Sequence, residues 1–203
     1  DLCRSRGLGD VYKRQVLHAA GVLRDMMLRA LDAQSLDASY APKADGASHV
    51  RSAVGASQPL EAFALFSSVA STFGNIGQAN YAAANAYLDA LASSRRRCGC
   101  VGSSLQIPAV SGAGMGANTF GEAQLEEMGG ISLDEFTACL GVSVAPVRGA
   151  AERTQAPLHP RLLESAEMPS LCELRRLRDT CVTERRSAAG APAPGSVLAQ
   201  CLT

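Results

Sequence analysis

Short apolar runs alternate with longer amphipathic segments through most of this chain of 203 residues. The runs at residues 16–20, 63–67 and 105–110 have the length of buried strands, and strands this apolar are typical of parallel sheets covered on both faces. Residues 43–56 and 81–97 have the periodicity of helices, and the second is the longest helix expected. Strands that alternate with helices predict an α/β fold with a parallel sheet.

Further elements are predicted around this framework. A helical stretch at residues 25–33 is expected to break at residues 35–42, and Pro42 suits the first turn of the helix that follows. The elements expected after the third strand are a lid-like helix at 117–128, a helix at 132–142 and a weak final strand at 144–149. The pattern weakens from residue 150, where the candidates are a charged helix at 171–186 and an Ala/Pro/Gly-rich linker at 187–194.

Composition limits the classes of function. The chain is 47% hydrophobic and 19% charged, with a formal net charge of zero, which favours an ordinary soluble core and disfavours nucleic acid as a partner. The three arginines at residues 95–97 suit the end of a helix, although a phosphate or carrier contact stays open. No apolar run approaches the ~20 residues of a membrane span. The seven cysteines lack zinc-like spacing, so we expect no metal site and reduced thiols in a cytoplasmic protein.

The candidate chemistry lies where the second strand meets the long helix. Ser68 ends the apolar run, Tyr81 follows thirteen residues later, and Asn85 lies four residues beyond it. Residues four apart share one face of a helix. A serine at a strand end and a tyrosine at the start of the next helix can converge on one small polar group, which suits proton transfer to a carbonyl oxygen. Ser67 competes with Ser68 for this role, and the spacing to Tyr81 favours Ser68.

This pattern resembles the ketoreductase domains of polyketide synthases and multifunctional fatty acid synthases, within the short-chain dehydrogenase/reductase superfamily. Most of that superfamily has Tyr-x-x-x-Lys, whereas these ketoreductases have Tyr-x-x-x-Asn and a lysine further upstream. Here Tyr81 and Asn85 form the pair, and Lys43 lies in a run that looks like the relocated-lysine motif. Residues 18–23 look like the strand-end motif that flanks the nicotinamide. The resemblance covers residues 16–142.

The resemblance implies an activity and a set of roles. The activity is NADPH-dependent reduction of a β-ketoacyl thioester, carried on an acyl carrier protein beside neighbouring synthase domains, to the 3-hydroxyacyl product. Tyr81 would donate the proton, Lys43 would lower the pKa of its phenol, Ser68 would bind the carbonyl oxygen and Asn85 would hold the lysine or a water. The residues implied to contact the cofactor are Ala19, Ala20, Gly21 and Pro108. An aspartate at position 25 weakly implies the D-configured alcohol.

The implied fold is a partial doubly wound Rossmann-type sheet, with a helical lid and a partly disordered C-terminal tail. The complete fold has strand order 3-2-1-4-5-6-7, a one-strand extension of the usual doubly wound order, and this chain would supply strands 4, 5, 6 and a weak 7. Residues 16–20 would then form an open edge. No glycine-rich phosphate loop precedes residue 16. Residues 112–117 fit G-x-G-x-x-A, but they suit a loop beside the nicotinamide better than a pyrophosphate loop.

Three segments are expected. Residues 5–15 back-translate to a transposon-based sequencing adapter ending in GATGTGTATAAGAGACAG, so residues 1–15 are expected to be an artefact, the alternative being a genuine basic loop. Residues 16–149 would be the C-terminal part of a ketoreductase domain, and residues 150–203 an inter-domain linker with a helix. We expect the isolated fragment to be inactive.

Other functions stay open. One alternative is another short-chain reductase that acts on a free small molecule, and a second is a non-catalytic structural or docking subdomain of a synthase. A serine hydrolase is disfavoured because Ser67 and Ser68 lack a G-x-S-x-G elbow. His18 is expected to be a core or loop histidine rather than a catalyst.

Overall fold

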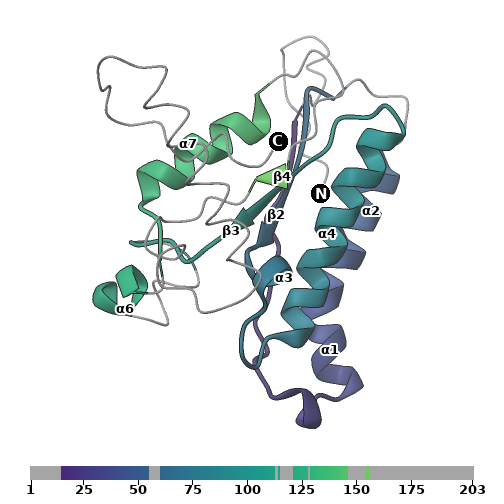
Figure 1. The fold of residues 1–203 in the computed structure, drawn as a ribbon. Coiled ribbons are helices and arrows are strands. Elements are labelled where there is room, and N and C mark those ends of the chain that lie inside the picture. Colours follow the sequence, from purple (N-terminus) through teal and green to yellow (C-terminus); the bar gives the residue numbers. More distant parts are fainter. Residues whose placement is uncertain are drawn as a thin grey trace, which may run out of the picture.

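The computed structural model describes residues 15–54, 60–112, 114, 121–127, 129–145 and 154–155. Their strands form one parallel sheet in the order β1-β2-β3-β4, so each strand lies beside its neighbour in the sequence (Figure 1). The strands are β1 (Gln15–His18), β2 (Ala62–Ser68), β3 (Ser103–Ile107) and β4 (Thr154–Gln155). The predicted parallel α/β fold is therefore confirmed.

Helices cover both faces of the sheet. In Figure 1, α1, α2 and α4 lie on one side of it and α7 lies on the other. The helical elements are η1 (Leu28–Ala30), α1 (Ala33–Tyr40), the π-helix η2 (Ala41–Asp45), α2 (Gly46–Val54), α3 (Ala70–Phe73), α4 (Ala79–Arg97), α6 (Glu122–Glu127) and α7 (Leu133–Val144). No helix in the described part of the chain is long and apolar enough to cross a membrane.

The central strand explains the continuous apolar run in the sequence. β2 pairs with β1 on one side and β3 on the other, and all but one of its residues are buried. A strand covered on both faces needs apolar side chains in both directions. β1, in contrast, is an edge strand of the described sheet, and its Leu17 side chain is 48% exposed. The expected open edge is thus present in the described part.

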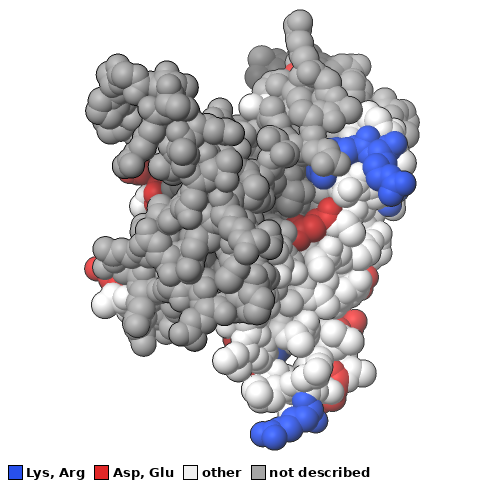
Figure 2. Space-filling model, in the orientation of Figure 1, with Lys and Arg blue, Asp and Glu red and all other residues white. Residues whose placement is uncertain are grey.

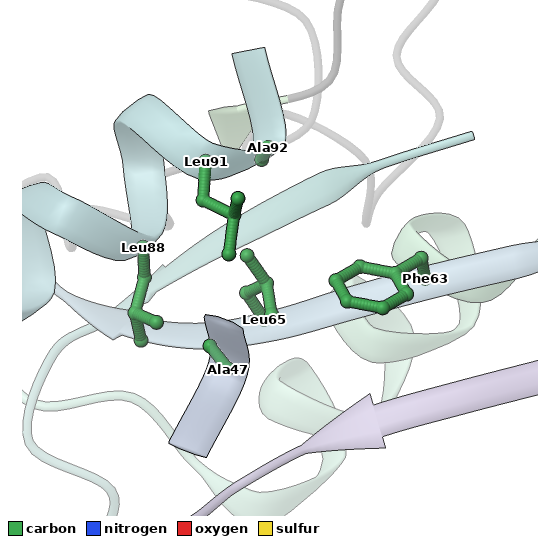
Figure 3. Close-up of a cluster of buried hydrophobic side chains, with 6 residues drawn as sticks. All are labelled: Ala47, Phe63, Leu65, Leu88, Leu91 and Ala92. Atoms are coloured by element: carbon green, nitrogen blue, oxygen red, sulfur yellow. The ribbon is translucent and has the colours of Figure 1, made fainter. Parts of the chain in front are cut away.

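The hydrophobic core lies between the sheet and the helices on one face. Figure 3 shows the cluster, whose members are Ala47, Phe63, Leu65, Leu88, Leu91 and Ala92. Alternate residues of a strand point to the same face, so Phe63 and Leu65 of β2 both meet α4. On the opposite face, the Phe66 ring packs edge-to-face against Phe136 of α7, with ring centroids 6.0 Å apart. The packing on both faces holds the end of β2 in place.

The predicted helix break at residues 35–42 is wrong. The chain is helical without interruption from Ala33 to Val54, through α1, η2 and α2. Asp32 starts this helix, because its side chain accepts a hydrogen bond of 2.8 Å from the Ser35 amide. Pro42 has no N–H and would clash with a carbonyl four residues earlier in a regular α-helix. The wider π-turn removes that conflict, so the proline lies inside the helix instead of starting it.

Smaller differences concern the strand and helix ends. β3 ends at Ile107, before Pro108, whereas the prediction extended it to residue 110; Val110 makes only an isolated bridge with Ile131. Within the segment 117–128, where a lid-like helix is expected, α6 is helical, and residues 115–120 and 128 lie outside the described part. The role of α6 as a lid stays a prediction. The helix candidate at 171–186 and the linker at 187–194 also lie outside it.

The start of the final strand was predicted too early. Val144 belongs to α7, and residues 146–149 of the predicted strand lie outside the described part. The strand that pairs with β3 is β4, at Thr154–Gln155. A capping box starts α7, because Ser132 and Glu135 each bond to the other's backbone amide. The Ser103 hydroxyl donates to the Ser143 carbonyl at 2.9 Å, which fastens the last turn of α7 to β3. The capping box and the packing of α7 against β3 together outweigh the strand propensity of Val142 and Val144.

Core packing can be tested at Leu65, which is fully buried. We expect Leu65→Ala to lower the free energy of unfolding by about 2–5 kcal/mol, because it removes packed methyl groups and leaves a cavity. Urea denaturation followed by circular dichroism measures this. The matched control is Leu28→Ala, since Leu28 is 72% exposed. Equal losses in the two variants would contradict the assigned core.

Candidate active site

The candidate residues meet at the carboxyl edge of the sheet. Ser68 ends β2, Tyr81 lies in the first turn of α4, and Lys43 lies in η2. All three side chains are buried, although they come from separate elements. The basic last turns of α2 and α4 lie at the opposite end of these helices, and Figure 2 shows Lys and Arg side chains gathered there. The site is therefore separate from this basic cluster.

Lys43 is buried and directed inward. Its Nζ donates a hydrogen bond of 2.8 Å to the Phe66 carbonyl and lies 5.3 Å from the centroid of the Tyr81 ring. Burial lowers the pKa of Lys43 to about 8, and the negative charge of Asp89 opposes this shift. A lysine with this pKa can give up or take a proton near neutral pH.

His18 supports the turn that carries Lys43. Its Nε2 lies 2.9 Å from the Lys43 carbonyl oxygen, and the ring is buried at the end of β1. Gly21 lies behind the lysine: a Cβ at this position would be 2.9 Å from the Lys43 Cε. Histidine in a structural position is what the sequence led us to expect. The glycine leaves the space that the lysine side chain occupies.

The environment of Tyr81 shifts the pKa of its phenol upward. Burial is the largest cause; hydrogen bonds from Asn85 and Ser68 lower the pKa, and the charge of Asp25 raises it further. The phenol therefore holds its proton at neutral pH. The expected lowering by Lys43, whose ammonium lies over the ring face and bonds to a backbone carbonyl, stays a prediction.

The two serines at the end of β2 have different partners. The Ser67 hydroxyl is directed to the Asn85 carbonyl of α4, at 3.3 Å. The Ser68 oxygen accepts a hydrogen bond of 3.2 Å from the Ala70 amide, and the Ser68 hydroxyl also interacts with the Tyr81 phenol. Ser68, and not Ser67, therefore lies beside the tyrosine; its catalytic role stays a prediction.

Asn85 lies at the centre of the buried face of α4. Its Nδ2 donates to the Tyr81 carbonyl at 2.8 Å. Its Oδ1 is buried and has no hydrogen-bond partner among the described residues. A buried amide oxygen usually has a partner, so this atom is suited to accept from a water or an ammonium.

The residues expected at the cofactor follow strand ends on the same edge. Ala19 and Ala20 follow β1 and are exposed, Gly21 is half-buried beside Lys43, and Pro108 follows β3. Small side chains at these positions leave room for a flat ring, so this part fits the nicotinamide end of a dinucleotide. Gly112 and Gly114 both have positive φ angles, of 79° and 83°. Most of the run that follows them lies outside the described residues.

Sequence reasoning missed Asn80, which precedes the tyrosine. Its Nδ2 donates to the Arg24 carbonyl at 2.8 Å and to the Ser39 hydroxyl at 3.1 Å, and its Oδ1 accepts from the Tyr81 amide at 2.9 Å. The amide thus joins α4, α1 and the loop after β1. The signal in the sequence was a polar residue in the first turn of an otherwise well-buried helix.

It also missed Asp89, which lies two turns after Tyr81 on the same face of α4 as Asn85. Its carboxylate accepts hydrogen bonds from Ser71 at 2.7 Å, from Gln106 at 2.9 Å and from Ser104. The spacing 81, 85, 89 could have revealed it, because residues at i, i+4 and i+8 share a face. Among the described residues, no three His, Cys, Asp or Glu side chains group as a metal site requires.

Comparison with known proteins gives a consistent result. A family model, the KR domain, matches residues 12–112. The spectinabilin polyketide synthase system protein NorA' of Streptomyces orinoci is 54% identical over 90 residues, which are 44% of this chain and 2% of that protein. The 6-methylsalicylic acid synthase of Penicillium terrestre is 39% identical over 156 residues, or 75% of this chain and 9% of that protein.

Two solved structures are similar as well. The first ketoreductase of the tylosin polyketide synthase has 36% identity and a TM-score of 0.57, covering 64% of this chain and 29% of that one. An A1-type ketoreductase has 34% identity and a TM-score of 0.60, covering 64% of this chain and 28% of that one. The chain therefore spans less than a third of these domains, and less than a tenth of the two synthases.

Fold and site define a Rossmann-type α/β protein of the ketoreductase class, whose members are oxidoreductases that use a nicotinamide cofactor. Through residues 12–112, the chain belongs to the KR domain family of polyketide synthases.

The lowered pKa of Lys43 predicts how stability depends on pH. The folded protein holds the lysine with a pKa of about 8, against its usual value of 10.5, so the unfolded chain binds more protons between these two pH values. The contribution of this group to the free energy of unfolding therefore rises as pH increases through that window. We expect urea denaturation from pH 7 to pH 10.5 to show the rise in the wild type and not in Lys43→Met. Parallel curves for the two proteins would contradict the burial of the charged amine.

Proposed function

We propose that residues 16–149 supply the catalytic part of an NADPH-dependent β-ketoacyl reductase of a polyketide or fatty acid synthase. The observation that supports this most is the convergence of Ser68, Tyr81 and Lys43 at the carboxyl edge of the sheet, with the Ser68 hydroxyl beside the Tyr81 phenol. In open α/β sheets, ligands bind outside the carboxyl ends of the strands. The arrangement suits a carbonyl oxygen held between a hydroxyl and a phenol.

Each residue then has a separate task in ketone reduction. The nicotinamide, when bound, supplies a hydride to the carbonyl carbon. Ser68 donates a hydrogen bond to the carbonyl oxygen, where negative charge develops. Tyr81 transfers its phenol proton to that oxygen, and the raised pKa keeps this proton in place until it is needed.

Lys43 and Asn85 would help to return a proton to the Tyr81 phenol after each turnover. With a pKa of about 8, Lys43 is mostly an ammonium at neutral pH and can replace the proton that Tyr81 gives up. The buried Oδ1 of Asn85 is an acceptor that could hold the ammonium or a water along this route. One proton from solvent per turnover then balances the hydride delivered to carbon.

The substrate and partners follow from the family. Several similar proteins bear the name polyketide synthase, and the chain covers only a few per cent of their length. We infer a β-ketoacyl thioester on the phosphopantetheine arm of an acyl carrier protein, with neighbouring synthase domains as partners, in the cytoplasm. Ala19, Ala20, Gly21 and Pro108 would contact NADPH.

The chain would act as one part of a larger domain. Residues 150–203 would link it to the next domain, residues 1–15 would derive from an adapter, and the isolated chain would be inactive. The rival function is that of a non-catalytic docking half. Asp25, which accepts a hydrogen bond of 2.9 Å from Gln78 near Tyr81, fits the D-configured product that the sequence weakly implies.

The tyrosine provides the first test of this function. Residues 16–149 would be joined to the amino-terminal half of a ketoreductase, and NADPH oxidation measured with a β-ketoacyl thioester. We expect Tyr81→Phe to lower kcat by about 100-fold or more, because the proton donor is lost. Tyr87→Phe is the matched control on the same helix, since the Tyr87 ring packs against Tyr40 and the hydrophobic core. Unchanged turnover in Tyr81→Phe would defeat the assignment, and an inactive parent would favour the docking half.

The two serines provide a second test. We expect Ser68→Ala to lower kcat by about 100-fold, because it removes a donor to the carbonyl oxygen, and to lower the melting temperature modestly, because the Ala70 amide loses its acceptor. Ser67→Ala should instead leave kcat within a few-fold and lower the melting temperature, since Ser67 bonds to the backbone of α4. Steady-state kinetics and thermal denaturation of both variants give the comparison. The reverse result would assign the role to Ser67.

A further inference from the structure

The position of Lys43 depends on an unusual piece of backbone. The lysine lies in the π-turn η2, where the Gly46 amide reaches back five residues to the Ala41 carbonyl. A π-turn inside a helix is strained relative to the α-helix on either side and is frequent at functional sites. Something outside the helix must therefore stabilise it. The same turn directs the Lys43 ammonium to the Phe66 carbonyl and the Tyr81 ring.

His18 is the side chain that meets this turn. Its Nε2 lies 2.9 Å from the Lys43 carbonyl oxygen, which also accepts from the Gly46 amide. The imidazole fits closely on its other side, because a Cβ at Gly46 would be 3.1 Å from the ring Cε1. The ring thus fills the space between β1 and η2. The ring bonds to the backbone carbonyl of Lys43 and not to its ammonium, which bonds to the Phe66 carbonyl instead.

The chemistry of this contact defines the state of the ring. A carbonyl oxygen only accepts hydrogen bonds, so the Nε2 of His18 must carry a hydrogen. Burial lowers the pKa of His18, the bond to the Lys43 carbonyl raises it, the charge of the Lys43 ammonium lowers it, and a bond to the Pro42 carbonyl raises it. The net direction is downward, so the ring is neutral at neutral pH, with its hydrogen on Nε2. His18 is then a permanent donor, which is what a backbone anchor requires.

We propose that His18 is a positioning residue for Lys43: its Nε2–H bond to the Lys43 carbonyl holds the π-turn in the conformation that buries the ammonium against β2 and Tyr81. The contribution of this bond to ketone reduction rests on the function proposed above. The bond itself does not, because it can be measured without cofactor, substrate or turnover.

The composition of the chain allows the pKa of the Lys43 amine to be measured individually. It is one of only two lysines, the other being Lys13. Competitive acylation of the 203-residue chain from pH 6 to pH 11, with mass spectrometry of the peptide that carries Lys43, gives the pH at which this amine becomes reactive. The wild-type midpoint should lie at about 8. The titratable groups that face the amine are His18 of β1 and Tyr81 and Asp89 of α4.

Two substitutions separate the hydrogen bond from the bulk of the ring. In His18→Gln, the side-chain amide nitrogen extends about as far as Nε2, so the bond to the Lys43 carbonyl is retained. In His18→Asn, the amide is too short to reach it. We expect the midpoint to stay near the wild-type value in His18→Gln and to rise by about 1 or more, toward 10.5, in His18→Asn. Val16→Ala is the control, because Val16 lies on the same strand and packs against the core.

The outcomes are distinct. Equal midpoints in folded His18→Asn and wild type would overturn the proposal, as would an equal rise in Val16→Ala, which would reduce the effect to lost packing. Circular dichroism reports whether each variant folds. Should His18→Asn not fold, nitrogen-15 NMR of the wild-type ring decides: an Nε2–H tautomer supports the proposal, and an Nδ1–H tautomer overturns it. If the His18–Lys43 bond is present in the wild type but the joined wild-type domain shows no reductase activity, the result would count against the proposed function and not against the positioning role of His18.

Discussion

The buried ammonium of Lys43 is the charge that the surrounding structure has to satisfy. An unpaired charge in a protein interior is costly, so the group must find acceptors or lose its proton. Here it finds the Phe66 carbonyl, the face of the Tyr81 ring and the field of Asp89, and its pKa still falls to about 8. β2, η2 and α4 must keep their relative positions for these contacts to form. The core of α4 against Phe63 and Leu65 maintains that arrangement.

Most polar groups around the lysine have partners within the protein. Ser67 bonds to the backbone of α4, Ser68 bonds to the Ala70 amide and the Tyr81 phenol, and Asn85 keeps an acceptor available. Asp89 draws in donors from α3 and β3. A site of this kind is stable because most of its polar atoms are satisfied within the protein. The few that are not point to where a ligand or water would bind.

Much of this architecture could be predicted from the sequence, and the exceptions have physical causes. The central strand and α4 were predictable because burial on both faces, or on one long face, leaves a strong apolar pattern. Ser68, Tyr81 and Asn85 were predictable from spacing, because regular elements convert spacing into position. Pro42 was misread because its local preference for a helix start is outweighed by contacts of the π-turn with β1. The upward shift of the Tyr81 pKa depends mainly on burial, which no spacing encodes.

The π-turn also limits how the chain can change in length. Such a turn contains about one residue more than a turn of α-helix, so deleting one residue within η2 would restore the regular helix. Side chains before the deletion would then rotate by about 100° relative to those after it. Either Lys43 or the packed face of α2 would leave its place. Evolution can therefore vary the residue types of this helix far more readily than the number of residues between Asp32 and Val54.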